Sequence, residues 1–286
     1  MKIALIGRGR LATNLLPALQ EAGHEVASIN SRTLEDLPLE ADVYIISVKD
    51  SALQEVISKV PAKVTPSSWR GLGAAPVFVH TAGSMPMSLF EGFATRYGVL
   101  YPMQTFSKER RVDFREIPVF IEATVVDGET ADRQPTTDRE ATVVDGSAVD
   151  TTLALLRSLA ESISDHVYEL STEQRKYLHL AAVFACNFAN HCYALSADVL
   201  AQVGLPFDVM LPLIDETARK VHELHPLDAQ TGPAVRYDEN VMQAQQQLLD
   251  DPLMRDIYQK MSQSIHQRAN ENHDQLRLTE DTGHRV

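Results

Sequence analysis

Short apolar runs alternate with helical patterns through the first half of the chain. The runs are KIALIG (2–7), EVASIN (25–30), DVYIISV (42–48), PVFVH (76–80), GVLYP (98–102) and PVFIEA (118–123). Helical patterns cover 11–21 and about 52–59. Because each run is apolar throughout instead of alternating, we expect strands buried on both faces. The pattern predicts an α/β, Rossmann-like, doubly wound parallel sheet with helices on both sides.

The second half reads as helix after helix. Apolar positions at helical spacing cover about 172–203, 206–224, 238–249 and 252–270, with glycine or proline at each break. We therefore predict a Rossmann-like NADP-binding domain (1–170), an all-α substrate and dimerisation domain (171–270) and a polar tail (271–286) that frays.

An internal repeat lies between these halves. The sequence EATVVDG occurs at 122–128 and again at 140–146, separated by a polar segment. Two copies do not make a solenoid, so we expect a duplicated loop insertion over 122–147, with a functional lid as the alternative.

The charge balance excludes some partners. The 286 residues include 39 acidic and 26 basic side chains, a formal net charge of -13. Without a run of cations, such a chain repels nucleic acid and anionic membrane surfaces. No apolar stretch is long enough for a signal-peptide core or a membrane span, so we expect a cytoplasmic protein. Cys186 and Cys192 lie about 120° apart on one predicted helix, which argues against a disulfide or a metal pair.

The first strand leads into a glycine motif, ALIGRGRLATNL, of the form G-x-G-x-x-A. Gly7 suits a tight turn, Gly9 a close approach to a pyrophosphate, and Ala12 close packing of helix on strand. The position between strand and helix predicts dinucleotide binding. The alternative is a Rossmann-like domain that has lost its ligand.

The end of the second strand bears on cofactor choice. An NAD site places an acidic residue there, whereas this chain has Asn30, Ser31 and Arg32. Arg32 can pair with a 2′-phosphate, which favours NADP(H) over NAD(H); the alternative is a surface arginine in a turn.

Other strand ends should face the same crevice, because ligands bind beyond the carboxyl ends of parallel strands. Asp50 follows the third strand and could therefore face this crevice, or it could instead cap the next helix. His80 is a candidate for contact with the nicotinamide or the substrate. The predicted cofactor-binding set is Gly7, Arg8, Gly9, Arg10, Leu11, Asn30, Ser31, Arg32, Val48, Lys49 and His80.

The segment LHLAAVFACNFANH (178–191) is unusual because polar groups interrupt a helix that is apolar nearly all round. At 100° per residue, His179, Asn187, Asn190 and His191 share one sector. An unpaired buried amide or imidazole costs about 1–3 kcal/mol, so these groups need partners. We predict His179 as a catalytic proton donor and Asn187 as an orienting residue, with a satisfied core histidine or a subunit interface as alternatives.

Loops supply the substrate candidates Gln104 and Thr105, after a strand, and Thr231 and Arg236, at a Gly-Pro break. No metal site is predicted, because the histidines lack an H-x-x-x-H pair, and neither G-x-S-x-G nor G-K-[ST] occurs.

Several motifs together carry a family resemblance: IGRGRLA, SVKDSALQEV, VHTAGSMPMSLF, YPMQTFSK, PVFIEA, KYLHLAAVFACNFANH and TGPAVRYD. In this order they resemble predicted NADP-dependent oxidoreductases with an N-terminal Rossmann-like domain and a C-terminal helical domain of unknown function. More distantly, the chain is similar to pyrroline-5-carboxylate reductase and 6-phosphogluconate dehydrogenase-like enzymes. The resemblance implies NADP and a homodimer formed through the helical domain. Val183 stands four residues before Asn187, so the lysine chemistry of the hydroxyacid dehydrogenases does not carry over.

The sequence therefore predicts an NADP(H)-dependent oxidoreductase that transfers a hydride to or from a small carbonyl or imine substrate. The alternatives are a non-catalytic NADP-binding regulatory module and a deazaflavin cofactor in the same fold.

Overall fold

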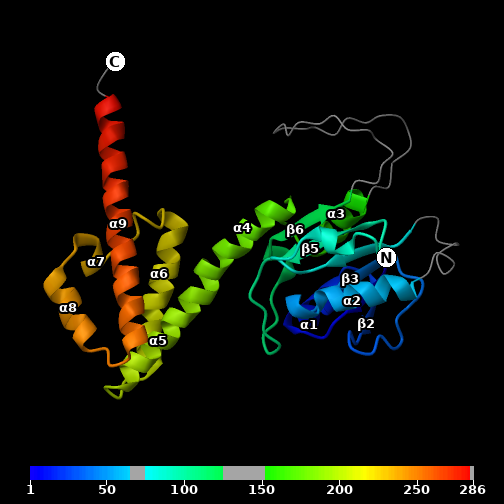
Figure 1. Ribbon diagram of the computed structural model, residues 1–286, viewed down its shortest axis with the longest axis horizontal. Coiled ribbons are helices and arrows are strands. Elements are labelled where there is room, and N and C mark those ends of the chain that lie inside the picture. The colour runs from blue at the N-terminus through cyan, green and yellow to red at the C-terminus, as the bar shows by residue number, and fades with distance from the viewer. Residues whose placement is uncertain (65–74, 125–151, 284–286) are drawn as a thin grey trace. The chain divides into compact units, whose positions relative to one another are not determined.

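The computed structural model describes residues 1–64, 75–124 and 152–283 (Figure 1). Contacts divide the chain into two units, Met1–Cys186 and Asn187–Val286. The division falls inside the long helical segment that follows Thr172, later than the boundary at 170/171 that we expected from the sequence.

A seven-stranded sheet forms the centre of the first unit, in the order β2-β1-β3-β4-β5-β6-β7. All neighbouring pairs are parallel except β5 and β6, so the doubly wound sheet that we predicted is mostly parallel, with one antiparallel pair. Parallel neighbours need a crossover connection, usually a helix, and the segment between β5 and β6 holds only the 3₁₀-helix Phe114–Glu116. The strands are β1 Lys2–Ile6, β2 Glu25–Ile29, β3 Val43–Ile46, β4 Val77–His80, β5 Tyr97–Pro102, β6 Val119–Ala123 and β7 Val167–Glu169.

Helices cover both faces of this sheet, as the continuous apolar runs predict. Alternate strand residues point to opposite faces and fill two separate apolar clusters. Helices α1 (Arg10–Glu21) and α3 (Thr152–Ile163) pack on one face, through residues such as Leu15 and Leu156. Helix α2 (Asp50–Lys63) and the 3₁₀-helix Met87–Phe90 pack on the other, through Leu53 and Phe90.

Helix α4 (Thr172–Ala182) is fixed to the sheet at its first turn. Ser171 and Gln174 form a reciprocal capping box at its N-terminus. Arg175 is fully buried; it forms an ion pair with Glu122 at the end of β6 and donates to the carbonyl of Met85 at 2.6 Å. Glu122 also accepts a hydrogen bond from the backbone N–H of Thr172 at 2.7 Å. The start of α4 is therefore tied to both β6 and the loop after β4.

Beyond α4 the helix does not keep regular α geometry. Residues Val183–Phe188 form a π-helix that leads into α5 (Ala189–Ala201). Asn187, Asn190 and His191 are exposed in this structure, so they are not the buried polar groups that our argument from the sequence assumed. The bearings calculated at 100° per residue also fail beyond Val183, because a π-helix closes its hydrogen bonds over five residues instead of four.

The second unit is all-helical. After α5 it contains the 3₁₀-helix Phe207–Met210 and then α6 Leu211–Glu223, α7 Pro233–Arg236, α8 Glu239–Gln247 and α9 Pro252–Gly283. Helix α9 continues through most of the segment that we expected to fray, since its polar sequence is rich in good helix formers. Most of the EATVVDG repeat, from residue 125 to the end of the second copy, lies outside the described residues. No described helix is long and apolar enough to cross a membrane.

Candidate functional site

The glycine motif follows β1. The strand order reverses between β1 and β3, so the motif lies at the topological switch point of the sheet. Gly7 has a φ of 126°, and an added Cβ would lie 2.0 Å from the carbonyl oxygen of Ser47, so only glycine fits. Gly9 forms the N-cap of α1 without a side-chain hydrogen bond, and an added Cβ there would meet nothing within 4 Å. The first turn of α1 therefore faces open space at the position where a dinucleotide-binding fold holds its pyrophosphate.

A cavity of about 1010 Å³ opens at this switch point within the first unit. It brings together residues from the glycine loop, the ends of β2, β3, β4 and β5, and helix α4. Of the predicted residues, it is lined by Gly7, Arg8, Gly9, Arg10, Leu11, Asn30, Ser31, Arg32, Val48, Lys49, Gln104 and His179.

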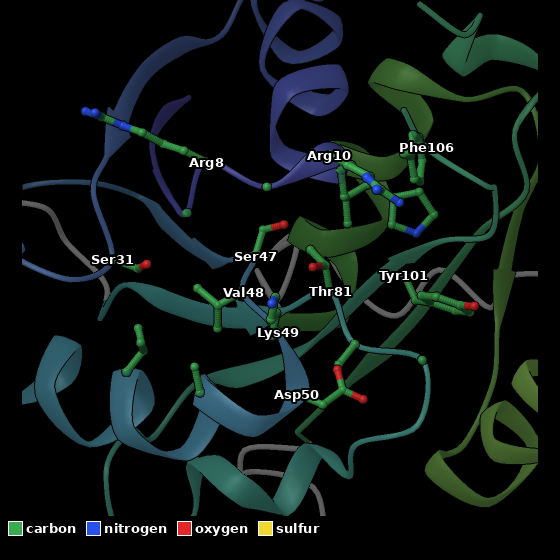
Figure 2. Close-up of a pocket in the computed structure, with 18 of the residues that line it drawn as sticks. Arg8, Arg10, Ser31, Ser47, Val48, Lys49, Asp50, Thr81, Tyr101 and Phe106 are labelled. Carbon is green, nitrogen blue, oxygen red and sulfur yellow. The ribbon is translucent and has the colours of Figure 1, made fainter. Parts of the chain in front are cut away.

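The charged side chains around this cavity are mainly basic. Arg8, Arg10, Arg32, Lys49 and Lys108 line it, against the acidic Asp50 and Glu55. Figure 2 shows Arg8 and Ser31 on one side of the site and Arg10, Phe106 and Tyr101 on the other. Such a surface suits a ligand with several negative charges.

Asp50, which lines the cavity, is hydrogen-bonded to Ser84 in the loop after β4. The Ser84 hydroxyl donates to Asp50 Oδ2 at 2.5 Å. This bond joins the first residue of α2 to the loop after β4. Asp50 is the first residue of α2 and its carboxylate holds that loop, while the capping role that we considered stays a prediction.

Tyr101 and His179 form the part of the cavity wall that lies across from the end of β2. The Tyr101 hydroxyl lies 3.1 Å from His179 Nδ1, at hydrogen-bonding distance. Both residues line the cavity. Burial raises the pKa of Tyr101; the nearby Arg175 cation opposes this shift, and Asp50 and Cys186 add to it. Tyr101 was missed in the sequence, although the strand-end argument that selected Lys49 applies equally to the end of GVLYP.

His80 does not line this cavity. It is fully buried, accepts a hydrogen bond from the Ala82 N–H at 3.2 Å through Nδ1, and donates from Nε2 to the carbonyl of Pro86 at 3.3 Å. Burial, and then the Arg175 cation, lower its pKa to about 4. Our expectation that His80 contacts a cofactor does not fit this position; instead the neutral ring holds the loop that carries Gly83.

The remaining candidates are dispersed. Thr105 lines a smaller neighbouring cavity of about 330 Å³, which Gln104 also borders. Asn187, Thr231 and Arg236 belong to the second unit, and their roles stay predictions. Among the described residues, no group of histidine, cysteine, aspartate or glutamate side chains could hold a metal ion.

Comparisons with known proteins agree with this geometry. A domain of unknown function, DUF2520, matches residues 142–265. A crystal structure from Bacteroides fragilis, provisionally named an NADP oxidoreductase, is 44% identical, with a TM-score of 0.75 over 93% of this chain and 98% of that one. The chain belongs to this NADP oxidoreductase family. No match was found among curated proteins.

More distant structures share the fold alone. A Thermotoga maritima protein is 18% identical, covering 95% of this chain and 99% of its own, with a TM-score of 0.64. A 1-pyrroline-5-carboxylate reductase from Streptococcus pyogenes is 13% identical, covering 95% and 98%, with a TM-score of 0.55.

The buried imidazole of His80 predicts a loss of stability in acid. Its pKa is 6.5 for the free side chain and about 4 in the fold, so between these two pH values the unfolded chain binds this proton and the folded chain largely does not. We expect the free energy of unfolding to fall between these pH values by roughly 3 kcal/mol more in the wild type than in His80→Gln. Chemical denaturation across a pH series measures this difference, with His222→Gln as the exposed control. Parallel wild-type and His80→Gln profiles would contradict the assignment.

Proposed function

We propose that the chain is an NADP(H)-dependent oxidoreductase that acts on a small carbonyl or imine compound. The observation that carries this proposal is a single cavity with a glycine loop at one end and the Tyr101–His179 pair at the other. When bound, NADP(H) supplies or accepts a hydride.

The residues present fit the cofactor. The open space before Gly9 and the uncapped first turn of α1 suit a diphosphate. Arg32 and Ser31 at the end of β2 suit the 2′-phosphate, and the Asn30 side chain accepts from the Arg32 N–H at 3.1 Å, which shapes this turn. The other cations of the cavity offset the negative charge of the ligand.

The opposite wall supports chemistry in addition to binding. Reduction of a carbonyl or imine requires a proton at the oxygen or nitrogen atom as the carbon receives its hydride. His179 and Tyr101 are the hydrogen-bonded polar pair at this end of the cavity, and we assign proton transfer to this wall. Gln104 borders the same end and can orient a substrate polar group.

The activity is tested by mixing the full chain with NADPH and with a panel of aldehydes, ketones, 2-oxo acids and cyclic imines, while following NADPH absorbance. We expect NADPH to bind and at least one compound to oxidise it. Failure to bind NADPH would overturn the proposal. Binding without oxidation by any compound would instead favour a non-catalytic binding module.

Cofactor choice is tested at Arg32. A charge-assisted hydrogen bond contributes about 1.5–3 kcal/mol, so Arg32→Ala should weaken NADPH binding about 10- to 100-fold. NADH binding should stay within about twofold, because NADH lacks the 2′-phosphate. Titration calorimetry measures both affinities, and Arg110→Ala removes a cation that does not line the cavity. An unchanged preference would reject the role of Arg32.

We further infer that the helical unit forms a homodimer. Among its described residues, the buried apolar side chains are Ala234, Met242, Leu249 and Met254. Large apolar side chains that are half or more exposed include Val203, Leu213, Leu248 and Leu253. A helical unit with so little core of its own is completed by apolar surface from a second copy.

This inference predicts a particle of two 31.7 kDa chains in sedimentation analysis. Leu213→Glu should shift the equilibrium toward monomer, because it buries a charge in the interface. Leu39→Glu, at a similarly exposed leucine of the first unit, should leave the mass unchanged. A wild type that sediments as a monomer at all concentrations would overturn the inference.

A further inference from the structure

The Tyr101–His179 pair has a defined geometry. Tyr101 is near the carboxyl end of β5, and His179 lies on α4, four residues beyond the buried Arg175. Their rings meet edge to face, with centroids 6.1 Å apart and planes at 66°. The phenol oxygen and Nδ1 therefore face each other at the cavity wall.

Gly83 makes room for this pair. A Cβ at position 83 would lie 2.7 Å from His179 Nδ1 and 2.7 Å from Tyr101 Cζ, distances that real Cβ contacts essentially never show. The loop that carries Gly83 is held on one side by His80 and on the other by the Ser84–Asp50 hydrogen bond. Any side chain here would push the phenol and the imidazole apart.

The surroundings favour a protonated phenol. Four groups act on Tyr101 besides burial: the Arg175 cation, Asp50, Cys186 and the His179 ring. Arg175 is already paired with Glu122. The net effect raises the pKa of Tyr101, so its O–H is intact near neutral pH and can be donated.

We propose that the Tyr101 hydroxyl is the proton donor to the substrate carbonyl oxygen or imine nitrogen, and that His179 Nδ1–H restores that proton. This assignment rests on the proposed function and adds Tyr101 as a catalytic residue ahead of His179.

The proton that the substrate receives is replaced through the Tyr101–His179 pair. As the substrate carbon receives a hydride, the C=O or C=N π bond breaks and its electrons form a new O–H or N–H bond with the Tyr101 proton. The phenolate then takes the proton from His179 Nδ1 while Nε2 of this partly exposed ring takes a proton from solvent, so the imidazole stays neutral. Exchange with solvent, which adds a proton at Nδ1 and removes one at Nε2, returns the ring to its starting tautomer. One solvent proton is consumed in each reduction, and oxidation runs the same steps in reverse.

The first test compares Tyr101→Phe with the wild type, using NADPH and two probes: p-nitrobenzaldehyde as the carbonyl and 1-pyrroline as the imine. Loss of a general acid should lower kcat about 10²- to 10⁴-fold. The dissociation constant for NADPH should stay within about twofold of the wild-type value, because the phenol lies opposite the phosphate-binding end. Tyr177→Phe, on an exposed tyrosine of the same helix as His179, should match the wild type.

The outcomes separate the two proposals. A wild type that oxidises NADPH with a probe while Tyr101→Phe retains its kcat within about threefold overturns the role of Tyr101 and leaves the proposed function standing. If no carbonyl or imine compound leads the wild type to oxidise NADPH, the proposed function and this assignment are overturned together.

The second test does not depend on turnover. In protein labelled with carbon isotope at the tyrosine ring, the Tyr101 signal is identified by its loss in Tyr101→Phe. We expect it to titrate above the ordinary value of 10.0 and to shift in both His179→Phe and Gly83→Ala. Lys176→Ala, an exposed change on the same helix, should leave the signal in place. A Tyr101 signal insensitive to His179→Phe would overturn the pair.

Discussion

The contact on which the site depends is the ion pair between Arg175 and Glu122. A buried guanidinium is costly unless its donors are matched, and here Glu122, the Met85 carbonyl and the Thr172 hydroxyl accept from it. Its Nε has no partner, so part of the desolvation cost is not offset. The contact fixes the start of α4 to the end of β6. Because residues four apart share a helix face, it also sets where His179 meets Tyr101.

The part of the cavity wall to which we assign proton transfer is thus built from segments far apart in sequence. Tyr101 comes from β5, His179 from α4, and Gly83 from the loop after β4. Each is placed by a different constraint. The register of β5 places Tyr101, the buried Arg175–Glu122 ion pair places His179, and the buried neutral imidazole of His80 places Gly83. The end to which we assign phosphate binding depends on fewer distant contacts, because one glycine turn and one helix terminus, adjacent in the chain, form most of it.

This difference explains what the sequence could predict. Strands β1 to β6, α1 and the glycine loop follow from local apolar runs and from residues adjacent in the chain, whereas the short strand β7 was not predicted. The Tyr101–His179 contact spans 78 residues, so no local pattern reveals it. We expected His80 to contact a ligand because it ends a strand. The sequence does not show that the following loop covers the imidazole and buries it. The π-helix at Val183–Phe188 was equally hidden, since its residues have no composition that separates them from an ordinary helix.

Asn14 links the two ends of the cavity. Its side-chain amide donates at once to the carbonyl of Arg10, in the first turn of α1, and to that of Ser107, in the loop that carries Gln104 and Phe106. One amide group therefore holds the first turn of α1 and the loop after β5 together. The same side chain therefore sets the spacing between two parts of the chain that are 93 residues apart and that both contribute to the cavity lining.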